Sequence, residues 1–399
     1  MNSPIRPVNR IRSRIDASFL SEKVLAFPTK YFFGVSMACD IHCPYCPRQY
    51  YTDEVKSGFM DYDDFLKILP WLEYADEAFL FGLGEPFLHP RFFDFLKAAK
   101  ETGVRVGTSS HGMSLDPETI RRIVEIGLDE LAVSIDGANR ETFETLRAGA
   151  GFDTVKDNIQ NLQEIKKQKG ADKPEVHVAM AVSSHNVRQM TGVVKLAGKL
   201  GATRVVFTDL ILVNPENASL SVSKTDLFWD QFHKAKRAAG RLGIQVLYFY
   251  QYPFPWKKEP AVARIRKGKH YFCTDPWRLA IIDRFGEMKP CCYYPPNVGN
   301  VFQTSLDRVI NGKESLHLRK SLLEGNVPEC CINCGMLSEL TAEESRKALD
   351  EAARLLDDAA NKEQISSQDE KDLRNILSEY RLKWKQMFPN AADPWKEQA

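Results

Sequence analysis

The sequence predicts an α/β protein, a partial (β/α)6 TIM-like barrel followed by a small cysteine-rich C-terminal domain and a helical tail. The barrel is predicted because apolar, strand-like stretches alternate with helix-like stretches from about residue 31 to residue 250. Near-continuous apolar strands separated by helices are typical of a parallel sheet that helices cover. The second domain is predicted because six of the nine cysteines lie between residues 273 and 334.

Six strands and five helices make up the predicted barrel. The expected strands are residues 31–37, 77–84, 104–110, 130–136, 175–183 and 204–213. The expected helices are residues 61–75, 90–103, 116–127, 152–168 and 186–201. In such barrels the loops after the strands build the active site. CDIHCPYCP follows the first strand and GLGEP follows the second, so both are expected on that face.

Four segments are expected along the chain: an N-terminal extension (1–30), the barrel (31–260), the cysteine-rich domain (261–337) and the tail (338–399). A hairpin is expected within residues 279–292. The tail contains two amphipathic helices, which we expect to pack on the body; binding of a partner protein is the alternative. Their apolar stripes are Leu349, Ala352, Leu356 and Ala359, then Leu373, Ile376, Leu377, Tyr380, Trp384 and Phe388.

Composition excludes several classes of function. The formal net charge is +1, so nucleic acid is an unlikely partner. The two basic stretches, residues 6–14 and 264–270, are expected to be solvated faces. The sequence has no apolar run long enough for a membrane helix and no secretory h-region, so we expect a cytoplasmic protein. Clustered cysteines in a reducing compartment indicate metal binding rather than disulfides.

The stretch CDIHCPYCP places Cys39, Cys43 and Cys46 at CxxxCxxC spacing. Three thiolates on a [4Fe–4S] cube leave one iron open to a substrate or cofactor. The alternative is structural zinc with His42 as the fourth ligand. Since His42 is adjacent to Cys43, that geometry is awkward for a tetrahedral shell. The motif therefore favours an iron–sulfur cluster.

With this motif after the first barrel strand, the chain resembles the radical S-adenosylmethionine (SAM) superfamily over residues 31 to about 250. The aromatic Tyr45 before the third cysteine strengthens the resemblance and is a candidate cofactor contact. The family's reduced [4Fe–4S] cluster binds SAM and splits it into methionine and a 5'-deoxyadenosyl radical, which takes a hydrogen atom from the substrate. The resemblance also implies an electron donor such as flavodoxin or ferredoxin.

Three further stretches match the family. GLGEP resembles its GGEP motif, so Gly84 and Glu85 are implied to hold the SAM amino group. Residues 134–149 resemble its fourth-strand segment, which makes Ser134 and Arg147 candidates for the SAM ribose and carboxylate. A helix cap and a solvated arginine are the alternatives. TSSHG stands where the family often has TNG, and it lacks the asparagine.

The late cysteines resemble the SPASM/Twitch extension of radical SAM enzymes, which holds auxiliary iron–sulfur clusters. Cys273, Cys291, Cys331 and Cys334 match its spacing, and four thiolates close a cube completely. The chain has no cysteine after Cys334, so we expect one auxiliary [4Fe–4S] cluster. The alternative is a four-cysteine zinc ribbon. Cys292 and Cys330 each adjoin a proposed ligand; either could replace its neighbour, although bystander packing is expected.

A closed auxiliary cluster can accept an electron from a substrate radical, so we expect a radical SAM oxidoreductase of the dehydrogenase type. The first strand begins near residue 31, which leaves no room before it for a leader-peptide domain. This favours a small molecule such as a sugar or aminocyclitol, with a peptide or protein maturase as the alternative and a zinc scaffold as a third. Candidate bases or substrate contacts are His185, Asp209 and Tyr252.

Overall fold

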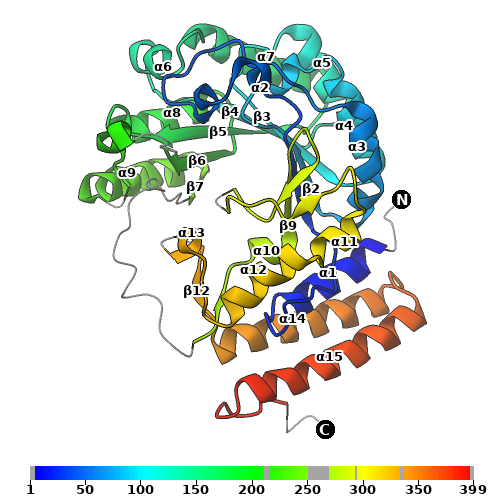
Figure 1. Cartoon of the computed structure of the whole chain (residues 1–399). Coiled ribbons are helices and arrows are strands. Elements are labelled where there is room, and N and C mark those ends of the chain that lie inside the picture. The colour runs from blue at the N-terminus through cyan, green and yellow to red at the C-terminus, as the bar shows by residue number, and fades with distance from the viewer. Residues whose placement is uncertain are drawn as a thin grey trace.

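The computed structural model describes residues 5–210, 215–223, 225–249, 269–292, 294–332, 334 and 336–395. Figure 1 shows a curved sheet with helices along its outer side and a helical layer below it. The expected α/β class with a partial barrel and a helical C-terminal region is confirmed. The expected contact of Tyr252 and the second basic stretch up to residue 268 lie outside the described residues.

One ten-stranded sheet joins the barrel to the cysteine-rich domain, in the order β11-β10-β9-β1-β2-β3-β4-β5-β6-β7. Neighbours from β1 to β7 are parallel, as is β9 beside β1, whereas β10 and β11 are antiparallel. The barrel strands are β1 (Lys30–Phe33), β2 (Glu77–Leu80), β3 (Arg105–Ser110), β4 (Glu130–Ser134), β5 (Glu175–Val182), β6 (Arg204–Asp209) and β7 (Gln245–Phe249). The others are β8 (Tyr271–Phe272), β9 (Leu279–Ile282), β10 (Glu287–Lys289), β11 (Gly299–Asn300) and β12 (Ser338–Glu339).

Helices follow most strands of the barrel (Figure 1). They are α2 (Asp53–Lys56), α3 (Tyr62–Ile68), α4 (Phe92–Glu101), α5 (Pro117–Ile126), α6 (Arg140–Leu146), α7 (Phe152–Lys169), α8 (Met190–Lys199) and α9 (Asp226–Leu242). The remaining helices are α1 (Ile5–Asp16), α10 (Asp275–Arg278), α11 (Leu306–Ile310), α12 (Lys313–Leu323), α13 (Glu329–Ile332), α14 (Ala342–Asn361) and α15 (Ser367–Met387). None of the described helices has the length and apolar character that crossing a bilayer requires.

Local chemistry explains where these helices begin and end. At α5 the Asp116 side chain accepts the N–H groups of Glu118 and Thr119, and Pro117 takes the first helical position. The helix ends at Gly127, whose φ of 83° suits glycine best. At α14, Thr341 and Glu344 form a reciprocal capping box.

The first strand is shorter than expected, because β1 ends at Phe33 rather than near residue 37. Beyond Gly34 the chain leaves the sheet and pairs with a neighbouring loop: Met60 N–H donates to the Val35 carbonyl, and Met37 N–H to that of Gly58. Residues 34–38, here called the stem of the cysteine loop, therefore connect β1 to that loop and are held by hydrogen bonds.

The alternation of side chains along β6 separates the inner face of the sheet from the helix-covered face. Val205, Phe207 and Asp209 are buried, and the ring of Phe207 lies 6.2 Å from that of Phe232 on α9. Thr208 and Val206 alternate with them and point to the inner face. This register matters for the active site, because it sets which residues can meet a substrate inside the barrel.

The N-terminal extension contains a helix that the sequence analysis did not predict. Helix α1 packs against α14 and α15 in a second core, separate from that of the barrel. Both expected stripes of the tail contribute to this core, so the tail packs on the body of the protein. The expectation that the basic stretch 6–14 is a solvated face is wrong for Arg6, which is buried. Its guanidinium donates to the carbonyl of Leu72, in the turn after α3, and to those of Thr102 and Gly103, just after α4.

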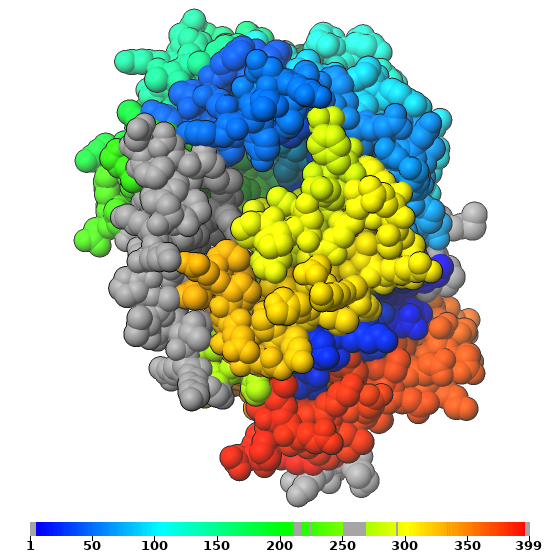
Figure 2. Space-filling model, in the orientation of Figure 1, coloured from blue at the N-terminus to red at the C-terminus, as the bar shows by residue number. Residues whose placement is uncertain are grey.

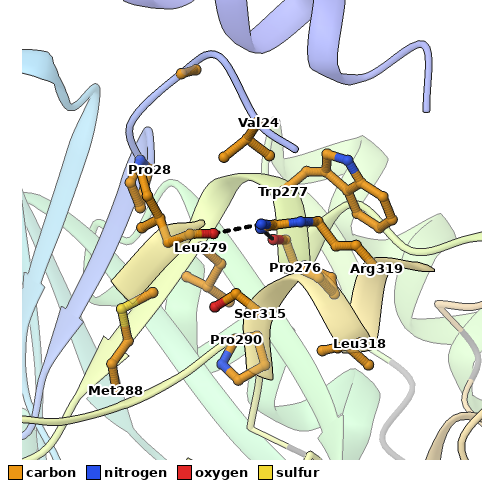
Figure 3. Close-up of a pocket in the computed structure, with 12 residues that line it drawn as sticks. Val24, Pro28, Pro276, Trp277, Leu279, Met288, Pro290, Ser315, Leu318 and Arg319 are labelled. Atoms are coloured by element: carbon orange, nitrogen blue, oxygen red, sulfur yellow. Dashed lines mark hydrogen bonds between the residues drawn. The ribbon is translucent and has the colours of Figure 1, made fainter. Parts of the chain in front are cut away.

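A buried arginine joins the N-terminal segment to the cysteine-rich domain (Figure 3). The guanidinium of Arg319 on α12 donates to the carbonyls of Glu22, Pro276 and Ile310, at 2.5, 3.0 and 2.5 Å. The cavity beside it measures about 10 Å³, which is too small for a substrate. We therefore regard this region as a structural junction.

Candidate active site

The cysteine loop lies at the carboxyl ends of the parallel strands, where the loops after β1 to β5 meet. His42 N–H donates to the Ala148 carbonyl at 2.7 Å, which ties the loop to the end of α6. The Tyr45 ring stacks on His185, from the loop after β5, with ring centroids 6.2 Å apart. The loop is thus held by elements distant in sequence.

The GLGEP loop pairs with the stem of the cysteine loop. Gly84 N–H donates to the Ser36 carbonyl at 3.1 Å, and Glu85 N–H to that of Ala38 at 2.7 Å. A Cβ atom on Gly84 would lie 2.4 Å from the Ala38 carbonyl oxygen and 2.5 Å from the Met37 carbonyl carbon. Only glycine allows this approach, so Gly84 sets the position of Cys39 through its stem.

The three thiols of the loop border one open cavity of about 680 Å³, which Asp40, His42 and Arg48 also line. Burial, aided by the nearby charges of Glu85, Cys43 and Asp40, raises the pKa of the Cys39 thiol to about 11. Burial also raises the pKa of Cys43, although Arg147 opposes this. Cluster binding must then displace these thiol protons. Among the described residues, three cysteines line this cavity, and three thiols are a donor set that fits a [4Fe–4S] cluster with an open iron.

Arg147 lies beside this donor set rather than in solvent. Its Nε donates to a carboxylate oxygen of Asp136 at 2.5 Å, and its guanidinium also hydrogen-bonds the Cys43 thiol. Asp136 is fixed in turn by the N–H of Ala181 at 2.8 Å. Ser134 stands half-buried at the end of β4 on the same face. Arg147 therefore lies beside the cysteine loop, and Ser134 lies at the carboxyl end of the same sheet.

The candidate bases fall in different places. His185 is exposed next to Tyr45. Asp209 is buried on the helix-covered face, and its two carboxylate oxygens accept the Tyr248 hydroxyl at 2.9 Å each. Tyr248 in turn packs on Phe228 of α9. This geometry disfavours Asp209 as a base, because the residue faces away from the barrel interior.

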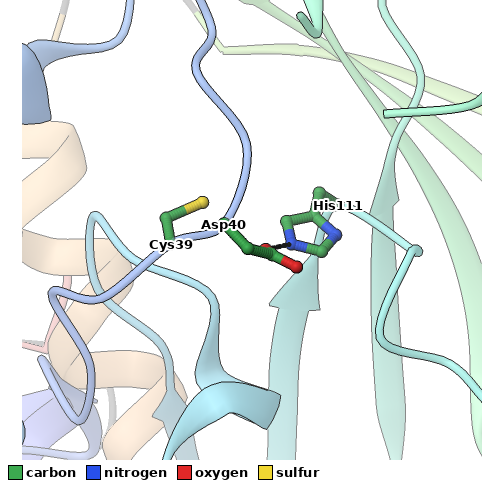
Figure 4. Close-up of side chains that lie close together, drawn as sticks. All are labelled: Cys39, Asp40 and His111. Atoms are coloured by element: carbon green, nitrogen blue, oxygen red, sulfur yellow. Dashed lines mark hydrogen bonds and ion pairs between the residues drawn. The ribbon is translucent and has the colours of Figure 1, made fainter. Parts of the chain in front are cut away.

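Sequence reasoning missed the most connected group of the site, Asp40 with His111 (Figure 4). His111 occupies the position where the family asparagine was expected, and its ring binds Asp40 at 2.7 Å. The Cys39 Sγ atom, an Asp40 oxygen and a His111 nitrogen all lie within 4.8 Å of one another. The available signal was a charged or polar residue in the loop after each of the first three strands: Asp40, Glu85 and His111.

The late cysteines come together from several elements. Cys273 follows β8, Cys291 follows β10, Cys331 belongs to α13 and Cys334 follows it. Burial and the charges of Asp275, Cys334 and Cys291 raise the pKa of the Cys273 thiol. The chemistry of this four-thiol set fits a closed cluster.

The two pairs of adjacent cysteines, Cys291–Cys292 and Cys330–Cys331, differ in their surroundings. Cys292 is exposed, whereas Cys331 packs against the main core. The pKa of Cys331 is raised by the adjacent Cys330 thiol and by burial, and also by Cys291 and Cys334. Cys330 Sγ lies 3.9 Å from Cys331 Sγ. The surroundings favour Cys291 over Cys292 as a cluster ligand. For the second pair, either Cys330 or Cys331 can be the ligand.

Residues 35–196 match the family model of the radical SAM superfamily, and residues 273–335 match the SPASM model, described as an iron–sulfur cluster-binding domain. The chain belongs to the radical SAM superfamily and carries a SPASM domain. Its cofactors accordingly include SAM, a [4Fe–4S] cluster and an auxiliary iron–sulfur centre. The SPASM match favours iron over the zinc alternative.

This radical SAM protein is similar in sequence to two curated proteins and in fold to one solved structure. It is 30% identical over 195 residues to the tungsten-containing aldehyde ferredoxin oxidoreductase cofactor-modifying protein of Pyrococcus furiosus, covering 47% of this chain and 53% of that protein. It is 24% identical over 277 residues to the AdoMet-dependent heme synthase of Methanosarcina barkeri, covering 67% and 77%. The chain thus spans about half the length of the first relative.

The solved structure is that of Streptococcus suis SuiB bound to precursor peptide SuiA. Its TM-score is 0.57 at 13% identity, over 74% of this chain and 67% of that chain. At this identity the likeness shows a shared fold.

Proposed function

We propose that this radical SAM protein cleaves SAM reductively, removes a hydrogen atom from a small molecule and completes a two-electron oxidation. The observation that carries the proposal is the presence of two thiol sets in one chain, three at an open cavity and four in the SPASM domain. When bound, the first cluster supplies the electron that splits SAM, and the auxiliary cluster supplies an acceptor for an electron from the substrate.

In this proposal Cys39, Cys43 and Cys46 hold the first cluster. Arg147, fixed by Asp136, places a positive charge beside Cys43 and is suited to the SAM carboxylate. Ser134 is suited to the ribose. Gly84 and Glu85 shape the wall between the cysteine loop and β3.

His185 is the proposed proton acceptor. It is exposed on the same face as the cysteine loop and is oriented by its stack on Tyr45. A neutral imidazole there can take the proton that a substrate radical releases before it is oxidised.

The names of two relatives, a cofactor-modifying protein and a heme synthase, support a small-molecule or cofactor-type substrate. The name of a third, the mycofactocin maturase MftC of Mycobacterium tuberculosis, supports the alternative of a maturase. A sugar or aminocyclitol stays a prediction from the sequence alone. The domain limits at residues 30, 260 and 337 also stay predictions. Because strands of the barrel and of the SPASM domain share one sheet, we treat the two domains as one structural unit.

The test is anaerobic reconstitution followed by assay of iron, sulfide and 5'-deoxyadenosine. We expect about eight irons per chain, the content of two cubes. Candidate alcohols, amines, tetrapyrroles and short peptides are then screened for products two hydrogens lighter. Products of unchanged mass would contradict the oxidation. About four irons with one zinc would remove the internal electron acceptor.

A further inference from the structure

The pairing of the strands defines which side chains form the inner face of the barrel. Val206 on β6 points to this face and pairs with Ala179 on β5, which pairs with Ser134 on β4. Residues paired across strands share a face, and alternate residues along a strand do so too. These rules add seven further inward side chains: Phe32, Phe79, Phe81, Ser109, Ala132, Ala181 and Thr208.

These inward side chains do not fill the barrel. All of them are partly exposed, whereas their neighbours along the strands, such as Leu80, Val133 and Val178, are buried. In a closed barrel the inward side chains pack into layers and exclude solvent. The inner face here therefore leaves room for a ligand. Figure 2 shows the surface hollowed between the blue segment that carries the cysteine loop and the yellow hairpin of β9 and β10.

Three phenyl rings form the β1–β2 part of the inner face. Phe32 and Phe79 stack with their centroids 4.9 Å apart and their planes at 15°, and Phe81 stands edge-on to Phe32 at 5.3 Å and 86°. Gly107 on β3 allows this arrangement, because a Cβ atom there would lie 2.7 Å from the Phe79 ring. The three rings, each partly exposed, offer an apolar surface on which a flat ring can pack.

The charged side chains of the inner face lie toward the amino-terminal ends of the strands and neutralise one another. They form two groups of ion pairs: Lys30 with Glu77, and Arg105 and Arg204 with Glu130 and Glu175. His177 lies beside Glu175, and burial lowers the pKa of its imidazole. The ten inward side chains described above are apolar or carry a hydroxyl group. A charged group of a substrate would lose its water there without gaining a counter-ion, which is costly.

We propose that the part of the substrate that enters the barrel is a flat, uncharged, conjugated ring that packs on Phe32, Phe79 and Phe81. This inference rests on the proposed function and names the substrate class of its site. The small side chains of Ala132 and Ala179 leave the space that such a ring needs, and the hydroxyl groups suit neutral polar substituents at its edge. An aminocyclitol, which carries ammonium groups, does not match this interior.

The test measures binding of matched probes by calorimetry to the holoenzyme loaded with SAM, with its clusters oxidised so that no SAM is cleaved. Naphthol is flat and neutral, naphthalenesulfonate adds a negative charge to the same ring, and decahydronaphthol is the saturated, puckered form. We expect naphthol to bind roughly 3- to 10-fold more tightly than decahydronaphthol, the range for an aromatic contact beyond burial alone. It should exceed naphthalenesulfonate by more than about 10-fold, because the sulfonate would lack a counter-ion. A diaminocyclitol should not bind.

Two variants place the probe on the inner face. Phe81→Leu keeps an apolar side chain but removes a ring, so it should weaken naphthol by roughly 3- to 10-fold and leave decahydronaphthol unchanged. Ala132→Leu fills the interior and should weaken both probes. The matched control is Phe285→Leu, which removes a ring that is 53% exposed on the hairpin of β9 and β10. It should change neither probe. Urea denaturation and SAM binding confirm that each variant is folded.

The outcomes separate this inference from the proposed function. Equal binding of naphthol and decahydronaphthol would overturn the flat ring, and equal binding of naphthalenesulfonate or tight binding of the diaminocyclitol would overturn the uncharged interior. Equal effects of Phe81→Leu and Phe285→Leu would move the probe away from the inner face and overturn the site. In each case a wild type that still forms 5'-deoxyadenosine leaves the proposed function standing. A wild type that forms none contradicts the proposed function, whatever the probes show.

Discussion

The two cysteine sites are built in different ways. The first takes its thiols from residues 39–46, one loop whose stem is hydrogen-bonded to the loop after β2. The SPASM site takes its thiols from residues 273–334, at the ends of β8 and β10 and around α13. The first site is therefore formed by one loop that the barrel supports. The second site forms only when the SPASM domain is folded, because its thiols come from several elements. Substitutions should affect the two sites differently.

The largest effect is expected at the local site. Cys46→Ala should abolish 5'-deoxyadenosine formation and lower the iron content from about eight to about four per chain. In the cluster-free protein the free energy of unfolding should change by less than about 1 kcal/mol, because Cys46 is partly exposed on a loop. Iron analysis and urea denaturation check this. A large loss of stability would break the contrast between the sites.

At the dispersed site the same kind of change should also cost stability. Cys273 is 9% exposed and belongs to the core, so Cys273→Ser buries a hydroxyl group there. We expect a loss of about four irons, and of about 1 to 3 kcal/mol in the cluster-free protein. SAM cleavage should persist while substrate oxidation stops.

The matched control is Cys292→Ser, at an exposed position beside a proposed ligand. It should retain the full iron content and the stability of the wild type. Loss of iron in this variant would mean that Cys292 is a ligand in place of Cys291.

The junction in Figure 3 should matter to the dispersed site alone. Arg319→Met leaves three carbonyl groups, one buried and two partly buried, without their donor, which we expect to cost about 2 to 4 kcal/mol. The auxiliary cluster should be lost at lower urea than the first cluster, as followed by absorbance and electron paramagnetic resonance. Lys320→Met, on the exposed side of the same helix, is the control. Simultaneous loss of both clusters would contradict a separate junction.

The smallest effect is expected in the helical core. Thr341→Ala removes the capping box of α14 and should lower stability by about 1 kcal/mol. Both clusters should be retained with unchanged iron content, because α14 packs in a separate core with α1 and α15. Loss of the auxiliary cluster here would show that any destabilisation strips it, which would weaken the interpretation of Arg319→Met.

Much of this architecture could be predicted from the sequence because its signals are local. The apolar runs predicted the first six strands of the barrel but not β7, and CxxxCxxC predicted a cluster-binding loop after the first strand. Contacts between segments far apart along the chain leave weaker patterns in the sequence. The pairing of β9 with β1 joins segments far apart along the chain, and the apolar stripe of α1 is interleaved with arginines, including the buried Arg6.

The site itself shows the same limit. Gly84 was expected to face a ligand, and in the structure its lack of a side chain lets the stem of the cysteine loop approach. Asp209 was a candidate base because it ends a strand, but one residue of register puts it on the helix-covered face. The importance of His111 could not be predicted from the sequence, because its ring contacts Asp40 and Glu85, which come from two other loops.

The pairing of β9 with β1 bears on how this protein can be divided. All four residues of β1 pair with β9 on one side and with β2 on the other. A chain cut before β9 would leave β1 as an open edge of apolar, β-prone residues, the kind of edge that recruits other chains and aggregates. The barrel and the SPASM domain should therefore be expressed together. Domain exchange with other radical SAM proteins should transfer the β9–β10 hairpin along with the barrel rather than cut at the linker before it.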